Sequence, residues 1–342
     1  MKVCIFGAGA IGGYIGHRFA RAGLDVSLIA RGPHLAAMRR DGLRLLIDGR
    51  EEVQRVRCTD APEELGPQDY VVIALKAHSI SGAIDSMQPL LDDHTTIVTS
   101  SNGLPYWYFD VAGVPFHGLA LASVDPGSLQ RRLLRPERAV GCVVFPATEI
   151  VAPGVIRHEH GGKFPIGEPD GRRTPRIEHL HAMFEAAGFD APVRSDIRDE
   201  IWLKLWGNLC FNPVSALTCA TIDVVATDAG TRAVLLSMMR EAEAIGGRLG
   251  LRLRVDAERR MAGAAALGPH KMSMLQDLER GRPLEIEALV GVILELGRAT
   301  GVPTPTVDVV HALIELRART GAALASGTPV PRTDSSTSGR DA

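Results

Sequence analysis

Three polar residues, Lys204, Asn208 and Asn212, recur every four positions in a segment whose apolar residues are spaced as in a helix. Four residues advance an α-helix by about 40° more than one full turn, so the three side chains form one slowly turning polar stripe. An apolar stripe runs directly beside it, and asparagine is a poor helix former that a solvent-facing helix would seldom carry twice. The pattern therefore favours a helix that lines a cleft over a helix that only faces solvent.

Lysine in such a cleft has a clear chemical use. When hydride reduces a ketone, negative charge develops on the carbonyl oxygen, and an ammonium group can stabilise that charge and then donate the proton. The lysine side chain is a flexible point charge, so neighbouring amides would help to orient it and the substrate. Lys204 is therefore a candidate general acid, and Asn208 and Asn212 are candidate substrate-binding residues.

A hydride donor is indicated at the N-terminus, where a glycine motif, G-x-G-x-x-G, joins a short apolar strand to an apolar helical segment. The first glycine permits a tight turn, the second lets the backbone approach a pyrophosphate, and the third lets helix and strand pack closely. The start of the helix offers backbone N–H groups and the positive end of its dipole to the phosphates. The predicted cofactor-binding residues of this loop are Gly7, Ala8, Gly9, Ala10, Ile11 and Gly12.

The next strand ends at Arg31 and not at an acidic residue. An NAD site usually places Asp or Glu there against the ribose 2′-hydroxyl, whereas an arginine accommodates the 2′-phosphate of NADP. Arg39 and Arg40 follow nearby in the sequence and add positive charge. The arginine could also be a solvated residue at the start of a loop, but we favour the phosphate interpretation and hence NADP.

Two further polar residues follow buried strands. The apolar run of residues 70–75 ends at Lys76, and the strand-like residues 95–99 lead into Asn102. Ligands of open parallel sheets bind beyond the carboxyl ends of the strands. Lys76 could neutralise a nucleotide phosphate, and Asn102 could bind the nicotinamide ribose or the substrate. Taken alone, each residue is explained equally well as a strand end or a turn residue.

The order of the elements predicts two domains. Strands alternate with helices up to residue 194, which is typical of a Rossmann-type α/β domain; residues 139–167 and 189–193 are expected to complete its sheet, and Asp48-Gly49 predicts a hairpin. Residues 195–325 show long helical patterns and predict an all-helical second domain. Residues 326–342 are polar and rich in Ser, Thr and Pro, which predicts a disordered tail.

Two candidate site residues of the second domain have ordinary structural explanations. Ser273 and Gln276 fit a capping box, with the serine as N-cap of a helix over residues 273–280. Pro283 and Glu285 would fall in the first turn of a helix over residues 284–300, where proline and acids are favoured in any case. Spacing alone singles out neither Ser273 nor Glu285.

The bulk composition excludes several classes of function. The 342 residues carry a net charge of −2, which is not the electrostatic footprint of a nucleic-acid-binding protein. No run of eighteen apolar residues suggests a membrane span, and the N-terminus is a strand and not a signal peptide. The five cysteines show no C-x-x-C spacing, so we expect reduced thiols, a cytoplasmic protein and no metal site.

Taken together, these motifs resemble the ketopantoate reductase (2-dehydropantoate 2-reductase) family. The matching stretches follow the family order from residue 7 to about residue 300: GAGAIGGYIG, ALKAHS, SSNGLP, WLKLWGNLCFNPVSALT and SMLQDLERGRPLEIEAL. The glycine motif alone is not specific, whereas the lysine–asparagine segment and the later serine–glutamate segment are.

The resemblance implies an NADPH-dependent reduction of 2-dehydropantoate to pantoate, with the active site between the two domains. By position, Lys204 corresponds to the general acid of the family, and Asn208 and Asn212 to its substrate-binding amides. Ser273 corresponds to the hydroxyl that binds the substrate carboxylate, and Glu285 to an acid at the cofactor and the active site.

The resemblance also implies the cofactor contacts. Lys76 and Asn102 correspond to a cofactor-binding pair, and Arg31 corresponds to the arginine at the adenosine phosphate. A backbone contact near Ala147 is a further expectation, from a looser match.

Two positions depart from the family pattern. His270 stands where the family often has Asn, three residues before the serine, and Ile222 stands where some members place another asparagine. Both positions concern substrate recognition, so another branched 2-oxo acid is an alternative substrate. A catalytically silent NADP-binding sensor is a weaker alternative of a different class. The apolar helices of the second domain could pack within one chain or form a homodimer.

Overall fold

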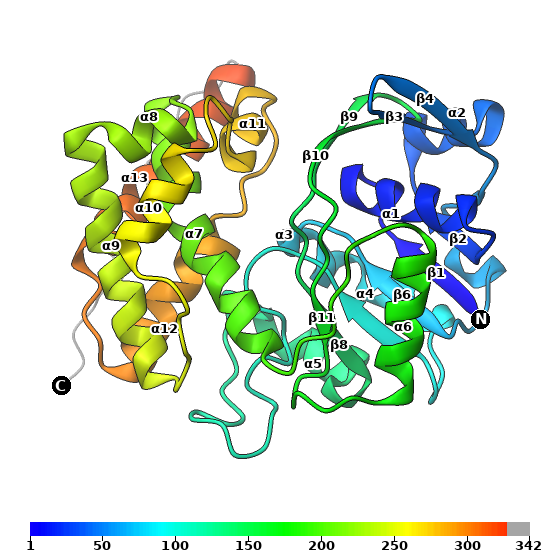
Figure 1. The fold of residues 1–342 in the computed structure, drawn as a ribbon, viewed down its shortest axis with the longest axis horizontal. Helices are drawn as coiled ribbons and strands as arrows, with labels where there is room; N and C mark the ends of the chain where they lie inside the picture. Colours follow the sequence, from blue (N-terminus) through cyan, green and yellow to red (C-terminus); the bar gives the residue numbers. More distant parts are fainter. Residues whose placement is uncertain (327–342) are drawn as a thin grey trace. The chain divides into compact units, whose positions relative to one another are not determined.

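The computed structural model describes the backbone of residues 1–326 and the side chains of residues 1–321 (Figure 1). The chain forms two compact units: residues 1–205 with 246–253 make the first, and residues 206–245 with the chain from residue 254 make the second. The border after Leu205 falls inside a helix, α7 (Ile197–Thr218), so this helix starts in one unit and ends in the other. The predicted tail lies outside the described residues, except for Ser326, the last residue of α13.

The first unit contains a seven-stranded sheet in the order β11-β8-β7-β6-β1-β2-β5. All neighbouring strands are parallel except β11, which runs antiparallel to β8. The strand order changes direction at β1 and β6, as in a Rossmann fold, so the predicted fold is confirmed. The strands are β1 (Lys2–Phe6), β2 (Asp25–Ile29), β5 (Arg57–Thr59), β6 (Tyr70–Ile73), β7 (Thr96–Thr99), β8 (Ala139–Cys142) and β11 (Ile166–Gly167).

A second, four-stranded sheet corrects part of the prediction. The Asp48-Gly49 hairpin is confirmed, with both residues in left-handed conformations, φ 50° and 71°. The strands β9 and β10 were expected in the main sheet but pair with this hairpin instead, in the order β4-β3-β10-β9. The reason lies in α1 (Ala10–Arg21): Gly13 has no side chain, so Ile156 of β10 packs directly on this helix. The strands are β3 (Leu43–Ile47), β4 (Arg50–Gln54), β9 (Ala147–Ala152) and β10 (Val155–His160).

Residues 189–193, expected to form a strand, do not form one. They run beside residues 162–167, but only two isolated bridges join the segments, Lys163 to Asp190 and Ile166 to Val193. Pro165 and Pro192 lack the N–H groups that a continuous ladder would need.

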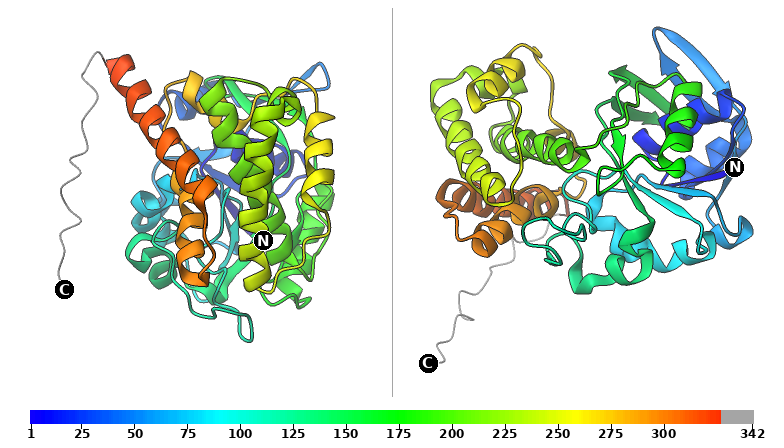
Figure 2. Two further views of the ribbon diagram at one scale, coloured as in Figure 1. Left: turned by 90° about the vertical axis from the view of Figure 1, so that its left-hand side faces the viewer. Right: turned by 60° about the horizontal axis from the view of Figure 1, so that its bottom comes forward.

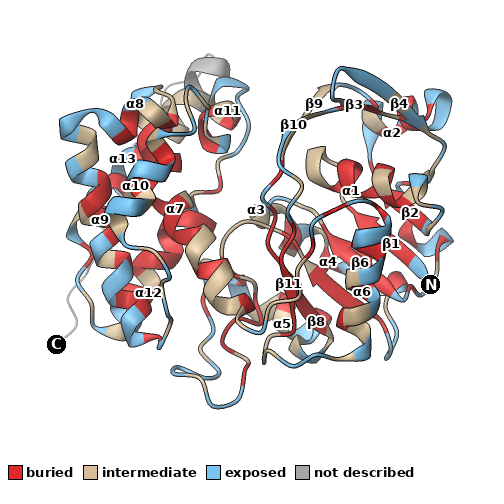
Figure 3. Cartoon of the chain, in the orientation of Figure 1, coloured by how far each residue is buried: buried red, intermediate tan, exposed pale blue. Residues whose placement is uncertain are grey.

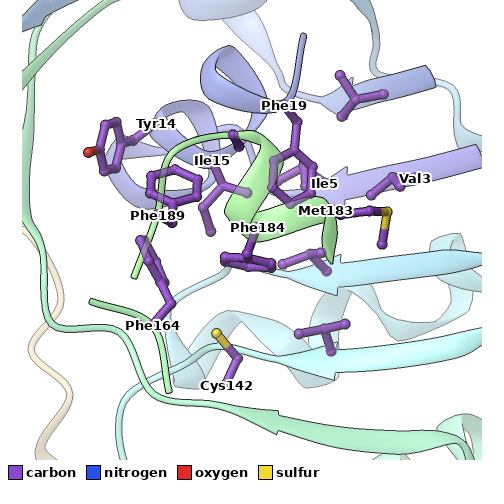
Figure 4. Close-up of a cluster of buried hydrophobic side chains, with 14 of the residues drawn as sticks. Val3, Ile5, Tyr14, Ile15, Phe19, Cys142, Phe164, Met183, Phe184 and Phe189 are labelled. Atoms are coloured by element: carbon purple, nitrogen blue, oxygen red, sulfur yellow. The ribbon is translucent and has the colours of Figure 1, made fainter. Parts of the chain in front are cut away.

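The core of the first unit holds the main sheet against α1 and α6 (Pro175–Ala186) (Figure 4). Phe19 of α1 meets Phe184 of α6 edge to face, with ring centroids 5.1 Å apart. Phe164 and Phe189 lie in similar contact at 4.8 Å. These aromatic contacts fix α1, and therefore the glycine loop at its start, against the sheet.

The described part of the second unit is helical, as predicted (Figure 2). Besides the end of α7, it contains α8 (Ile222–Thr227), most of α9 (Ala229–Arg248), α10 (Ala257–Ala265), α11 (Ser273–Glu279), a π-turn (Glu287–Gly291), α12 (Val292–Thr300) and α13 (Pro305–Ser326). The last three residues of α9 fall in the first unit. The residues of α7 are mostly buried (Figure 3). Within the described residues, no helix is long and apolar enough to cross a membrane.

Several helix boundaries differ from those predicted. The helix expected from residue 284 starts at Ile286 and opens with the π-turn, so Glu285 precedes the helix instead of lying in its first turn. The helix α7 runs seven residues past its predicted end at Phe211, through Pro213 to Thr218. The short helices α8 and α10 were not predicted individually, because six and nine residues carry little periodicity.

Candidate active site

The three glycines of the N-terminal motif have three different environments. Gly7 has φ 105°, a conformation that disfavours any side chain. A Cβ atom on Gly12 would lie 2.0 Å from the Gly7 carbonyl oxygen and 2.9 Å from Ala74 Cβ, so this glycine packs helix on strand. A Cβ atom on Gly9 would meet no protein atom within 4 Å. The space beside Gly9 is therefore left open, as a bound pyrophosphate requires.

The backbone amides of this loop divide into two groups. Gly7 and Ala8 donate to the Ile29 carbonyl oxygen, at 3.3 and 2.8 Å, and so hold the loop to β2. The amides from Ala10 to Gly12 open α1 and have no carbonyl four residues earlier within the helix. No acidic residue occupies the first turn of α1. An anion that lies beside Gly9 would therefore find unopposed donors and the positive end of the helix dipole.

Two serine hydroxyls bring Lys76 and Asn102 to the same edge of the sheet. Ser100 Oγ donates to the Ile73 carbonyl oxygen (2.7 Å), and Ser101 Oγ donates to that of Leu75 (3.0 Å). The β6–β7 pairing therefore continues past both strand ends, and Lys76 and Asn102 follow at corresponding positions. Because β6 also pairs with β1, this edge carries the glycine loop and lies where the strand order changes direction.

Arg31 lies at the end of the neighbouring strand and is the N-cap of α2 (Gly32–Asp41). Its side chain is exposed, and the structure shows no ion pair between it and any described carboxylate. Arg39 and Arg40 lie at the opposite end of α2, where they pair with Asp60 and Asp41. The positive charges of Arg39 and Arg40 are therefore already paired with carboxylates. Of the three arginines, only Arg31 has no carboxylate partner among the described residues, so it is the one that could pair with a phosphate.

Lys204 lies near the same edge, because α7 begins on the sheet. Ile197, in the first turn, packs over two glycines, and Cβ atoms on Gly141 and Gly167 would each approach it to 2.8 Å. Two turns later the Lys204 ammonium acts on Cys142, the last residue of β8: burial raises the pKa of that thiol to about 12, and the lysine charge opposes the rise. Lys204 therefore lies close to the carboxyl end of β8. This strand pairs with β7, which leads to Asn102.

In the second unit, Asn212 caps α11. Its Oδ1 atom accepts hydrogen bonds from the Ser273 hydroxyl (3.1 Å) and the Met274 backbone N–H (3.0 Å). The predicted capping box is therefore wrong: Met272 is the N-cap, and an amide from another helix takes the capping role. Asn212 is fully buried, and its Nδ2 atom has no acceptor among the described residues. Such a donor is costly to leave unsatisfied, and a ligand is one way to satisfy it.

The remaining predicted residues lie as follows. Asn208 is half-buried on α7, one turn beyond Lys204. Glu285 is buried, and its carbonyl oxygen accepts the Leu289 N–H of the π-turn. Ala147 begins β9, in the four-stranded sheet and not in the main one.

The two positions that depart from the family pattern are neighbours. The Ile222 N–H donates to the His270 carbonyl oxygen at 2.9 Å. Ile222 is buried at the start of α8, whereas His270 is half-buried. Both departures therefore change one small region of the second unit.

Comparison with known proteins gives a consistent result. Residues 3–106 match the family model described as ketopantoate reductase PanE/ApbA, and residues 196–318 match its C-terminal model. The chain belongs to the ketopantoate reductase family. A 2-dehydropantoate 2-reductase from Mesorhizobium japonicum is 54% identical over 92% of this chain and 97% of its own length.

Solved structures of this family have the same fold. A structure from Ralstonia solanacearum MolK2 is 40% identical, has a TM-score of 0.89 and covers 96% of this chain and 99% of its own. A PanE/ApbA family ketopantoate reductase from Ralstonia eutropha is 31% identical, with a TM-score of 0.81 over 94% and 99%. A complex of D-mandelate dehydrogenase with NADH and anilino(oxo)acetate is 18% identical and shares the fold.

Sequence reasoning missed the residues that connect the site. The sequence pattern assigns no role to Ser100 and Ser101, whose hydroxyls align Lys76 with Asn102. The capping of α11 by Asn212 was also missed, because the two partners are 61 residues apart. The run Ser100-Ser101-Asn102-Gly103 was the available signal for the serines, since hydroxyls beyond a strand end commonly bind backbone groups.

Proposed function

We propose that this protein reduces 2-dehydropantoate to pantoate with NADPH. The observation that carries the proposal is that the first unit gathers a glycine loop, Asn102 and Lys204 at the carboxyl edge of one parallel sheet. The name of the Mesorhizobium japonicum relative, which shares 54% of its residues with this chain, supports the choice of substrate.

The glycine loop, Lys76 and Asn102 would hold the nucleotide, which supplies the hydride when bound. Gly9 leaves room for the pyrophosphate, and the amides from Ala10 to Gly12 would donate to it. Arg31 supports NADP over NAD, because an exposed guanidinium without a described carboxylate partner suits a 2′-phosphate. The Ala147 backbone and Glu285 remain predicted cofactor contacts.

Lys204 would donate a proton to the carbonyl oxygen of the substrate as the C–H bond forms. Asn102, Asn208 and Ser273 would bind the substrate, and Glu285 would act at the active site. Asn212 serves first as a positioning residue, because its Oδ1 atom holds the Ser273 hydroxyl and the start of α11. A hydroxyl has one proton, so a substrate carboxylate would compete with Asn212 for it.

Cytoplasmic location and a homodimer also remain predictions. A ketopantoate reductase from Staphylococcus aureus is described as dimeric, and at 18% identity it shares the fold with this chain. Gel filtration with light scattering on the full chain would measure the oligomeric state directly.

The deciding experiment measures NADPH consumption by the purified protein with 2-dehydropantoate and a panel of other 2-oxo acids, with NADH in parallel. Rapid turnover of 2-dehydropantoate with NADPH is the expected result. Preferential turnover of another acid would retain the chemistry and reassign the substrate. The adjacent departures at Ile222 and His270 are the observation that favours that second candidate. NADPH binding without turnover of any acid would overturn the proposal and favour a nucleotide sensor.

A further inference from the structure

The loop that carries Asn102 is closed at its base by a buried tryptophan. The indole Nε1 of Trp107 donates to the hydroxyl of Thr99, the last residue of β7, at 3.0 Å. The Thr99 hydroxyl donates in turn to the Val140 carbonyl oxygen of β8 at 3.1 Å. Trp107 itself is fully buried. Asn102 therefore lies in a short loop whose two ends, residues 99 and 107, are fixed to each other and to the sheet.

The same tryptophan lies beside the start of α7. A Cβ atom on Gly141 of β8 would be 3.2 and 3.3 Å from two ring carbons of Trp107, Cζ2 and Cη2. The same Cβ atom would be 2.8 Å from Cγ1 of Ile197, the first residue of α7. The indole ring and the first turn of α7 therefore share the space over one glycine.

The next residue, Tyr108, is joined to the second residue of α7, Arg198, by three interactions. The Tyr108 hydroxyl donates to the Arg198 carbonyl oxygen at 3.0 Å, and Arg198 Nε donates to the Tyr108 carbonyl oxygen at 3.0 Å. The guanidinium carbon lies 4.6 Å from the centre of the tyrosine ring, which is a cation–π contact. We call these three interactions together the Tyr108–Arg198 contact.

The Tyr108–Arg198 contact is removed from water. Tyr108 is 1% exposed, and burial raises its pKa, so the phenol keeps the proton that it donates to Arg198. The Nη2 atom of Arg198 is buried as well and has no acceptor among the described residues. Moving either side chain would leave further buried polar atoms without a partner, and this cost fixes the pair in one geometry.

These contacts fix the first turn of α7 relative to the loop of Asn102. All of the residues involved belong to the first unit, which extends to Leu205 and so includes Lys204. Lys204 follows Arg198 by six residues on the same helix, which is about 9 Å along the axis. Successive backbone hydrogen bonds make this part of the helix one body, so a change in the direction of its first turn moves Lys204 with it.

Proton donation is sensitive to such a movement, because misplacing a catalytic group by about 1 Å can lower a rate about 10²-fold. In the proposed reaction, Lys204 must meet the carbonyl oxygen while Asn102 holds the cofactor or the acid. We propose that the Tyr108–Arg198 contact positions Lys204 relative to Asn102 for proton transfer. This inference rests on the proposed function, to which it adds two positioning residues that act through Lys204.

The first test is the steady-state kinetics of Tyr108→Phe and Arg198→Met, with Tyr106→Phe as the matched control. Tyr106 is a buried tyrosine of the same turn, and its hydroxyl donates to a carbonyl oxygen outside α7, that of Arg135, at 3.4 Å. Both tyrosine variants therefore remove one buried hydroxyl, but only Tyr108→Phe removes a bond to α7.

Tyr108→Phe should lower kcat about 5- to 20-fold, and Arg198→Met should lower it about 10- to 100-fold. KM for 2-dehydropantoate and the affinity for NADPH should stay within about twofold. Arg198→Lys keeps the charge without the Nε donor and should fall between Arg198→Met and the wild type, whereas Tyr106→Phe should keep the wild-type kcat. A wild-type kcat in both Tyr108→Phe and Arg198→Met overturns the proposal.

A double variant shows whether the effect passes through Lys204. If Tyr108→Phe acts by moving the lysine, it should not lower kcat further in a Lys204→Met background. A purely structural loss would lower kcat by the same factor in both backgrounds, and that result overturns the positioning role.

Hydrogen exchange separates this proposal from the proposed function. Mass spectrometry of the full chain should show faster amide exchange over residues 201–205 in Tyr108→Phe than in Tyr106→Phe or the wild type, whether or not any 2-oxo acid is reduced. If this difference appears in a protein that reduces no 2-oxo acid, the proposed function fails while the hold on α7 stands. Equal exchange in the two variants refutes the Tyr108–Arg198 contact as the hold on α7.

Discussion

The proposed nucleotide region of the first unit and the proposed substrate region of the second are built from different chemical groups. The nucleotide region is made of backbone: glycines that create space, amides that open α1, and strand ends aligned by the main sheet. The proposed substrate region is made of side chains that come from separate helices, such as Asn212 of α7 and Ser273 of α11. A site made of backbone groups can be recognised from a short sequence motif, whereas a site made of side chains depends on contacts between distant parts of the chain.

The largest effect should come from Lys204→Met. Loss of a general acid should lower kcat by about 10²- to 10⁴-fold and leave NADPH affinity within about twofold. Lys163→Met, at an exposed lysine of the first unit, is the matched control. Fluorescence titration with NADPH and steady-state kinetics measure the two quantities. Turnover at the wild-type rate would remove Lys204 from the chemistry.

Two glycine variants test whether the nucleotide region is truly a backbone site. Gly12→Ala places a methyl group on the Gly7 carbonyl oxygen, so it should destabilise the fold by about 3 kcal/mol or more in urea unfolding. Gly9→Ala meets no protein atom, so stability should stay within about 0.5 kcal/mol while NADPH affinity falls at least about tenfold. Unchanged NADPH binding in Gly9→Ala would contradict the position given to the pyrophosphate.

Arg31 is the one side chain on which cofactor choice should depend. Arg31→Gln should weaken NADPH about 10- to 100-fold and change NADH by less than about twofold. Arg39→Gln, at the far end of α2, provides the control because its charge is already paired with Asp60. Equal losses for both nucleotides in the Arg31 variant would exclude a contact with the 2′-phosphate.

Asn212→Ala should give a smaller effect, confined to the substrate region. The variant leaves the start of α11 without its cap, and stability should fall by about 1 to 3 kcal/mol, together with a higher KM for the acid. Ser273→Ala removes only one partner of the same amide and should cost less stability. NADPH affinity should not change in either variant. A lower NADPH affinity in Asn212→Ala would break the proposed separation between the two regions.

The same division explains what the sequence could predict. The Rossmann-type fold, the glycine loop and the helical second unit follow from local patterns, and the structure confirms them. The pairing of β9 and β10 with the hairpin does not follow from local patterns, because it depends on Ile156 packing against Gly13 of α1. Ser273 was expected to cap its own helix, and only the folded chain brings Asn212 to that position. Gly207 is recognisable in the sequence as a residue that weakens the helix α7. Only the structure shows that the Arg260 guanidinium occupies the space that a side chain at this position would need.

The continuity of α7 limits how this protein can change over evolutionary time. Lys204 belongs to one unit and Asn208 to the other, yet a single helix carries both. Inserting or deleting one residue between them would rotate the asparagines by about 100° relative to the lysine. Substitutions of side chains along this segment would leave that angle unchanged, whereas a change in its length would not. The helix therefore fixes the angle around its axis between Lys204 and the two asparagines, Asn208 and Asn212.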